Sequence, residues 1–374
     1  MPNEKPRLFV GRGRLDDDVT RRWRTEVDDE AQCAAQIAQG RMDDPADYSA
    51  DPGLVDAMNV ALLLGRPLLL TGRPGTGKSQ FADRVAWEFA LAPVLRFEAQ
   101  SVSEARDLFY GFDMIGRMAA AQPGAAGRSD PERFITLAAL GKAVIYSKPL
   151  AGANAQTAEA ESPGAAPAAG IRLTPAHPAP LEGRASVVLI DEIDKASRDF
   201  PNDLLNAIER FSYEIPELEG RRFEAARGPQ TRPIVIITSN SERELPEPFL
   251  RRCVYYHIPP PGADTLKRIV AARVLDRGED GKPPAELPTL FRELVDCFEA
   301  YTKLAGRDIV FTPGTSELID LAKVVAADPE AQPDEPLRHD ANLASARRAA
   351  AAVAKGKGDA EAFGKHLGSW TKQP

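Results

Sequence analysis

An α/β fold with a parallel sheet, followed by a small helical domain, is the architecture that the sequence predicts. The prediction rests on two observations. Between residues 51 and 97, a helical segment, an apolar strand, a glycine-rich turn, a second helical segment and a second strand follow one another. This alternation is typical of layered α/β domains. After Pro261, by contrast, apolar residues recur at helical spacing,.

The first elements are marked by turn residues and by apolar spacing. Asp51-Pro52-Gly53 opens a helical run, and Gly65-Arg66 turns the chain into a strand. Phe81, Val85 and Phe89 recur at four-residue spacing, the period of a buried helix face,. The elements predicted here are helices at 54–64 and from 78 onward, and strands at 67–71 and 94–97.

The pattern breaks at residues 149–183, which are rich in Ala, Gly and Pro. Such a segment cannot bury a core, so we expect a flexible surface insertion. Order resumes at Ser186 with Val-Val-Leu-Ile, a run typical of a strand that is buried on both faces,. The further elements predicted are a helix at 200–211, a hairpin within 212–230, and strands at 233–238 and 254–258.

The C-terminal part is predicted to be helical, because stripes such as Leu290, Leu294 and Phe298 lie on one helix face,. Its helices are expected at 264–275, 289–304, 315–326 and from 341 onward. The predicted domain organisation is a polar N-terminal arm or docking helix at 1–45, an α/β domain at 46–260 and a helical domain at 261–374.

Composition narrows the function classes. The net charge is −8, which disfavours a nucleic-acid-binding surface, since phosphate backbones require clustered Lys and Arg. The three cysteines and four histidines are scattered, so neither a disulfide framework nor a zinc site fits,. Neither a signal-peptide core nor an apolar run of membrane-spanning length is found, and the cytoplasm is the expected location,.

Residues 72–79 read Gly-Arg-Pro-Gly-Thr-Gly-Lys-Ser and match the P-loop pattern G-x-x-x-x-G-K-[ST] at every fixed position,. Glycines let the backbone N–H groups point at phosphate oxygens, and the helix that follows favours negative charge at its N-terminus. Lys78 is expected to reach the β- and γ-phosphates and Ser79 to bind Mg²⁺. The flanking strand and helix disfavour a chance glycine-rich turn. The predicted nucleotide-binding residues are Gly72, Arg73, Pro74, Gly75, Thr76, Gly77, Lys78, Ser79 and Gln80.

The apolar strand at 187–190 ends in Asp191-Glu192. Ligands bind at the carboxyl ends of strands in α/β folds. We expect Asp191 to hold Mg²⁺ and Glu192 to orient and polarise the attacking water. A solvated acidic turn is the alternative if the pair is considered alone, but the P-loop makes the catalytic role the better explanation.

Two further candidates follow the later strands. Asn240 comes after the strand at 233–238 and is placed to contact the γ-phosphate or the water, with capping of the strand end as the simpler alternative. Arg251 and Arg252 precede the last strand. They suit an arginine finger that acts on a neighbouring subunit's nucleotide, and a surface basic pair is the alternative.

The chain resembles the AAA+ ATPases in three segments that occur in the family's order: GRPGTGKS, VVLIDEIDKA and IVIITSNSERELPEPFLRRC. Within them the chain is similar to the MoxR-type group. The segment at 101–118 resembles the group's insertion after the second strand, and the hairpin within 212–230 lies where the group has one. FTPGTSELIDLAK resembles the start of a lid helix. The resemblance covers roughly residues 46–330.

The resemblance implies a P-loop αβα sandwich with a five-stranded parallel sheet and a helical lid, with ATP between them. It places Asn240 at the sensor-1 position and Arg252 at the arginine finger, with Arg251 as the alternative. It also implies a hexameric ring that uses ATP, with Mg²⁺, as a chaperone-like motor on a protein partner, often one with a von Willebrand A-type domain.

One departure from the family pattern lies in the lid. An arginine is usual at the sensor-2 position, where this chain has Gly314-Thr315-Ser316-Glu317, and the nearest arginine is Arg307. Slow hydrolysis is one expected consequence. The main alternative function is therefore a slow-turnover nucleotide switch or scaffold, ahead of a nucleic-acid motor and a small-molecule kinase.

Aromatic residues gather beside glycine at Phe109, Tyr110 and Phe112. In a ring they would suit a loop that faces a substrate, but aromatic side chains at such spacing are more often packed in the interior. Packing is the favoured interpretation.

Overall fold

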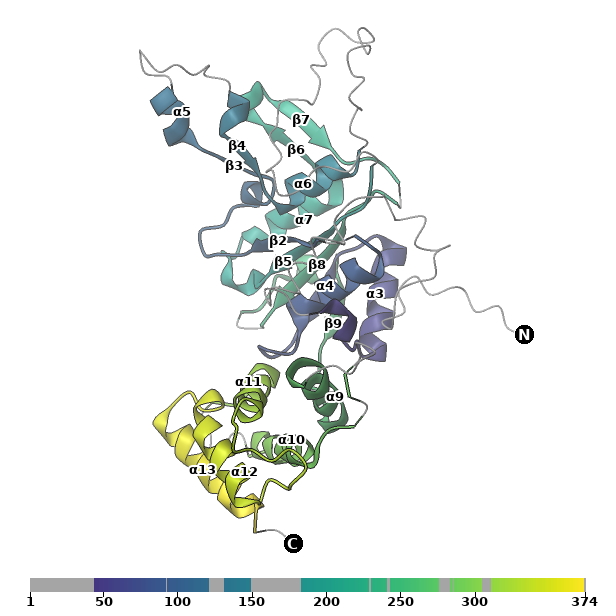
Figure 1. The fold of residues 1–374 in the computed structure, drawn as a ribbon. Helices are drawn as coiled ribbons and strands as arrows, with labels where there is room; N and C mark the ends of the chain where they lie inside the picture. Colours follow the sequence, from purple (N-terminus) through teal and green to yellow (C-terminus); the bar gives the residue numbers. More distant parts are fainter. Residues whose placement is uncertain are drawn as a thin grey trace, which may run out of the picture. The chain divides into compact units, whose positions relative to one another are not determined.

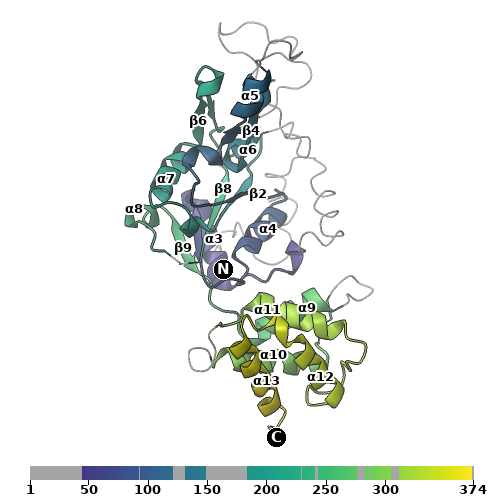
Figure 2. The same ribbon diagram turned by 90° about the vertical axis from the view of Figure 1, so that its left-hand side faces the viewer.

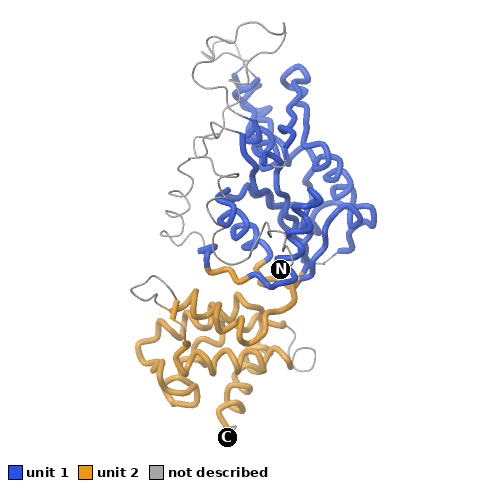
Figure 3. Tube along the Cα trace, turned by 90° about the vertical axis from the view of Figure 1, so that its right-hand side faces the viewer, with its two compact units in different colours: residues 1–46, 50–71, 78–257 blue, residues 47–49, 72–77, 258–374 orange. Residues whose placement is uncertain are grey.

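The computed structural model describes residues 44–91, 93–120, 131–148, 183–228, 230–240, 243–275, 283–284, 286–304 and 311–372. Most of the predicted N-terminal arm, nearly all of the predicted insertion, and Arg307 lie outside this range. The chain divides into two compact units (Figure 3). Unit 1 includes 50–71 and 78–257, and unit 2 includes 72–77 and 258–374. The predicted domain boundary at residues 260 and 261 stays a prediction.

A five-stranded sheet forms the centre of unit 1, and all of its strands are parallel (Figure 1). Continuous apolar runs explain its burial on both faces, because every residue from Ile234 to Ser239 is buried,. The predicted α/β class is confirmed. In sheet order the strands are β2 (Leu95–Glu98), β5 (Val187–Asp191), β8 (Ile234–Ser239), β1 (Leu68–Thr71) and β9 (Val254–His257).

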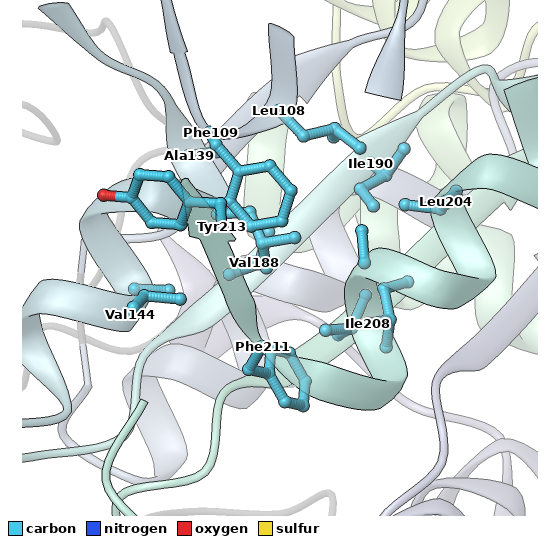
Figure 4. Close-up of a cluster of buried hydrophobic side chains, with 14 of the residues drawn as sticks. Leu108, Phe109, Ala139, Val144, Val188, Ile190, Leu204, Ile208, Phe211 and Tyr213 are labelled. Atoms are coloured by element: carbon cyan, nitrogen blue, oxygen red, sulfur yellow. The ribbon is translucent and has the colours of Figure 1, made fainter. Parts of the chain in front are cut away.

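Helices cover both faces of the sheet. On one face α3 (Pro52–Leu64) contacts β1 and β9, while α4 (Lys78–Glu88) contacts β5 and β8. On the other face α6 (Ala139–Tyr146) and α7 (Phe200–Arg210) pack on alternate residues of the strands. Figure 4 shows Val188 and Ile190 of β5 in this cluster with Leu204 and Ile208 of α7. The result is the predicted three-layer sandwich.

Two antiparallel strand pairs extend unit 1: β3 (Tyr110–Phe112) with β4 (Ile135–Leu137), and the hairpin of β6 (Ser212–Ile215) with β7 (Arg221–Glu224). The hairpin was predicted; the pair of β3 and β4 was not. Between them the ring of Phe109 stacks on Tyr213 with 4.7 Å between centroids. Phe109 and Tyr110 are buried, as the packing interpretation predicts, and Phe112 is partly buried against the same cluster.

The part of unit 2 that follows the sheet is helical (Figure 2). Leu290, Leu294 and Phe298, predicted as one stripe, are buried in a single apolar cluster with Phe363. Within the described residues, no helix is both long and apolar enough to cross a membrane. The helices of this part are α9 (Ala263–Val274), α10 (Thr289–Thr302), α11 (Thr315–Ala326), α12 (Asp340–Arg348) and α13 (Lys357–Trp370). The short helices of unit 1 are α5 (Met114–Ala120) and α8 (Glu247–Leu250).

Candidate active site

The glycine-rich loop at 72–77 joins β1 directly to α4. Gly75 and Gly77 have φ angles of 75° and 82°, a left-handed conformation that side chains disfavour,. Inside the loop the hydroxyl of Thr76 donates to the Arg73 carbonyl over 2.9 Å. The chain therefore reaches the first turn of α4, whose N–H groups have no partner within the helix, through a tightly curled backbone. This is the local geometry that anion binding requires.

Lys78 and Ser79 form the first turn of α4. Lys78 is only 6% exposed. Burial lowers the pKa of its ammonium, and the negative charges of Asp191, Asp194 and Glu192 oppose that shift. A buried cation surrounded by carboxylates is stabilised further when a polyanion binds beside it.

Asp191 lies at the carboxyl end of β5, opposite α4. The Ser79 hydroxyl donates to its carboxylate, with 2.9 Å to each of the two oxygens. These two side chains, predicted from separate motifs 112 residues apart, are therefore in direct contact. A hydroxyl and a carboxylate are hard oxygen ligands, and Mg²⁺ in nucleotide sites is held by one or two such groups with phosphates and water. The pair fits Mg²⁺.

Glu192 follows β5 with a φ of 55°, in the left-handed region. Its side chain makes two contacts: the Asn240 amide nitrogen donates to Oε1 over 3.1 Å, and the Lys195 ammonium pairs with Oε2. The structure thus brings together Glu192 and Asn240, as the sequence predicts. It also shows that both oxygens of the candidate catalytic carboxylate are engaged.

Two residues that the sequence analysis did not assign to the site hold this arrangement in place. Thr238 is fully buried at the end of β8; its hydroxyl donates to Asp191 and accepts the Glu192 N–H over 2.9 Å. The Asp194 carboxylate accepts the Asn240 N–H, with 3.2 Å to each oxygen. The only signals in the sequence were a polar residue ending an apolar strand and a second aspartate after Asp191.

Arg251 and Arg252 do not join these residues. Arg251 pairs with Glu247 one turn earlier on α8, and the Nε of Arg252 lies 3.1 Å from Glu209 on α7. Their side chains are 76% and 49% exposed. Both arginines are therefore on the surface of unit 1, which is where a residue must lie to reach a neighbouring subunit.

A family model for the AAA domain of the dynein-related subfamily matches residues 67–253. The chain belongs to this AAA family. The matched segment begins just before β1 and ends just before β9, so it contains the P-loop, Asp191-Glu192 and Asn240. No curated protein matches the chain at a significant level.

Solved structures of two AAA proteins are similar to the chain. One is the FIGL-1 AAA domain in complex with ADP, with 14% identity, a TM-score of 0.37, and coverage of 86% of this chain and 88% of that one. The other is a variant of Thermotoga maritima RuvB, with 13% identity, a TM-score of 0.39, and coverage of 78% of this chain and 66% of that one.

Proposed function

We propose that the chain is an ATPase of the AAA+ type, similar to the MoxR group, that remodels a protein partner. One observation carries the proposal: Ser79, Asp191, Glu192 and Asn240 meet at the carboxyl edge of the sheet, beside the start of α4. Membership of the AAA family supports it. Following the resemblance, we also propose a cytoplasmic hexameric ring and a partner with a von Willebrand A-type domain.

The residues divide the reaction among them. The loop at 72–77 and Lys78 bind and orient the phosphates of ATP, and Asn240 holds the carboxylate of Glu192. Glu192 accepts a proton from the attacking water. The oxygen of that water bonds to the γ-phosphorus while the bond between the γ-phosphorus and the leaving oxygen of ADP breaks. Ser79 and Asp191 would hold Mg²⁺, which neutralises charge on the phosphates.

A slow-turnover switch is the second candidate, because the ammonium of Lys195 and the amide of Asn240 occupy both oxygens of Glu192. Each oxygen keeps a second lone pair, so the contacts fix the orientation of the carboxylate rather than block it, and water is activated only when a free lone pair faces it. In this form of the function ATP binds and stays bound, and hydrolysis awaits a partner that moves Lys195 or Asn240.

The test is ATP binding and ATP turnover by wild type and Glu192→Gln, each over a series of protein concentrations. We expect Glu192→Gln to bind ATP as wild type does, and to lose turnover by about 10²–10⁴-fold, the usual contribution of a general base. Normal turnover by Glu192→Gln would exclude Glu192 as the base. If ATP stayed bound to the wild-type protein without being hydrolysed, the switch would be favoured over the motor.

A further inference from the structure

Unit 1 contains a pocket of about 900 Å³ at the edge of the sheet opposite the P-loop. Its floor includes Pro67, Ile234 and Val235, which lie at the amino ends of β1 and β8. Asp191 and Asn240 lie at the carboxyl ends of their strands instead, so the pocket is separate from the candidate active site. Its volume is in the range of sites that bind a large ligand or several side chains.

Two helix ends form the walls of the pocket. The helix α3 stops at Gly65, which adopts a left-handed φ of 59°, and α7 stops at Phe211, with a φ of 43°. The sequence predicted that α7 would include Phe211; the helix ends one residue earlier because Phe211 leaves the helical conformation. Residues of the connection between β7 and β8 complete the wall.

The apolar lining continues onto the surface. Leu63 and Leu64, in the last turn of α3, are 75% and 57% exposed and belong to the pocket lining. They adjoin the buried Met58 and Ala61 of the same helix. Aliphatic side chains exposed beside an apolar pocket mark an interaction surface rather than an ordinary solvated face.

The rim of the pocket is basic although the chain is acidic. Two glutamates and five arginines line it, a surplus of three positive charges in a protein whose net charge is −8. Arg66 and Arg222 form no ion pair with any residue that the structure describes. The five arginines are Arg66, Arg210, Arg222, Arg227 and Arg232.

Arg232 makes two contacts at this rim. Its guanidinium lies over the ring of Phe211, 5.3 Å from the centroid, and against the backbone of Gly65, where an added Cβ would come within 3.3 Å. The cation therefore covers one face of the aromatic ring at the mouth of the pocket. The planar guanidinium is pre-organised, so it loses less freedom for each hydrogen bond that it forms with a carboxylate.

We propose that this pocket docks an acidic amphipathic helix of a partner protein. Aliphatic side chains of the helix would fill the pocket beside Leu63 and Leu64, and its Asp and Glu side chains would meet the arginine rim. Nucleic acid fits less well, because single strands need open aromatic faces for stacking, and Arg232 covers Phe211,. The proposal concerns binding and does not rest on ATP turnover.

The test is selection from a displayed library of random peptides, each about four helical turns long, against the whole chain, followed by affinity measurement with synthetic copies of the enriched peptides. The variants are Leu63→Asp and the double change Arg66→Glu with Arg222→Glu, all at exposed positions. Val324→Asp and the double change Arg338→Glu with Lys357→Glu, at exposed positions of unit 2, are the controls matched in polarity and charge. Thermal unfolding and ATP binding confirm that each variant is folded.

We expect enriched peptides with Leu, Ile or Val at helical spacing and with several Asp or Glu residues. Both pocket variants should weaken their binding by about tenfold or more, equivalent to about 1.4 kcal/mol, and the controls should not. The proposal would be overturned if the enriched peptides bound the pocket variants and wild type equally. It would also be overturned if the selection yielded no peptide whose binding is weakened by the pocket variants. If oleate displaced the peptides and bound more tightly than they do, the pocket would be a lipid site instead. Loss of self-assembly in Leu63→Asp would identify an interface between copies of the chain.

Discussion

Thr238 connects the two carboxylates that the proposed reaction needs. Its single hydroxyl donates to Asp191 and accepts the N–H of Glu192. The hydroxyl thereby fixes the side chain that would hold Mg²⁺ and the backbone that positions the candidate base. Because Thr238 is fully buried, removing the hydroxyl costs these two contacts in the interior of the protein.

We predict that Thr238→Val lowers ATP turnover by about 10–100-fold, the usual effect of losing a group that supports a metal ligand. Valine keeps the shape and β-branching of threonine, so the fold should persist. The measurement is turnover as a function of Mg²⁺ concentration. A positioning role predicts that the variant needs more Mg²⁺ to reach half of its maximal rate.

Thr238→Ser, which keeps the hydroxyl, is the control and should retain the wild-type dependence on Mg²⁺. If Thr238→Val lost stability but kept that dependence, the hydroxyl would have a structural role only.

The sequence predicted the chemical groups of the site better than their supports. Lys78, Ser79, Asp191 and Glu192 belong to motifs with fixed local spacing, so one sequence suffices to find them. Thr238 acts across neighbouring strands, and its partners are set by the register of β5 with β8. Register is a tertiary property, which local spacing does not specify.

At the scale of the element, α4 contains a buried ion pair that could not be predicted from the spacing of its apolar residues. Arg84 and Glu88 are one turn apart, and their side chains are 1% and 0% exposed. The Arg84 guanidinium also donates to the carbonyls of Pro45 and Ala46, over 3.2 and 3.0 Å, and lies over the ring of Trp87. The helix that follows the P-loop is thus anchored to the segment before α3 by a buried cation.

We predict that Glu88→Ala lowers the free energy of unfolding by about 3–5 kcal/mol, because it leaves the Arg84 charge buried without its carboxylate. Chemical denaturation monitored by tryptophan fluorescence measures the change. Glu224→Ala is the comparison, since it breaks the exposed pair with Arg227, and such pairs contribute about 0–1 kcal/mol. Equal losses in the two variants would show that the buried pair has no special role.

Length and regularity decided which elements could be predicted. The central strands and the helices α10 and α11 are long apolar or periodic runs, and their predicted bounds agree with the structure to within two residues,. The antiparallel pair of β3 and β4 was missed. Each of its strands has three residues, too few for an alternating pattern to register,. Residues in and beside them contact the hairpin of β6 and β7, as in the stacking of Phe109 on Tyr213, and local spacing does not reveal such tertiary contacts.

At the scale of the whole molecule, we propose that the reaction uses more than one copy of the chain. Arg251 and Arg252 are exposed and pair with surface glutamates of their own subunit rather than with Asp191 or Glu192. An arginine finger contributes about 10³–10⁵-fold to turnover. If one of these arginines supplies it, the active site is completed only where two subunits meet, in a head-to-tail contact that can close into a ring.

Mixing two inactive variants tests this arrangement. Arg252→Ala keeps an intact P-loop but lacks the proposed finger, whereas Lys78→Ala lacks the phosphate-facing ammonium but keeps Arg252. We predict that each variant alone has almost no turnover, and that an equal mixture recovers up to about a quarter of the wild-type rate, the share of interfaces that random assembly makes complete. The measurement is ATP turnover of the mixture over a range of total protein concentration.

Arg251→Ala mixed with Lys78→Ala is the matched experiment, and it identifies which arginine acts. If Arg252 is the finger, Arg251→Ala is active on its own and Arg252→Ala is not. If Arg251 is the finger, Arg252→Ala is active on its own and Arg251→Ala is not. A mixture that stays inactive while both variants assemble would mean that the site is complete within one subunit. The exposed arginines would then be no more than a basic pair on the surface, and the ring motor would lose its main structural support.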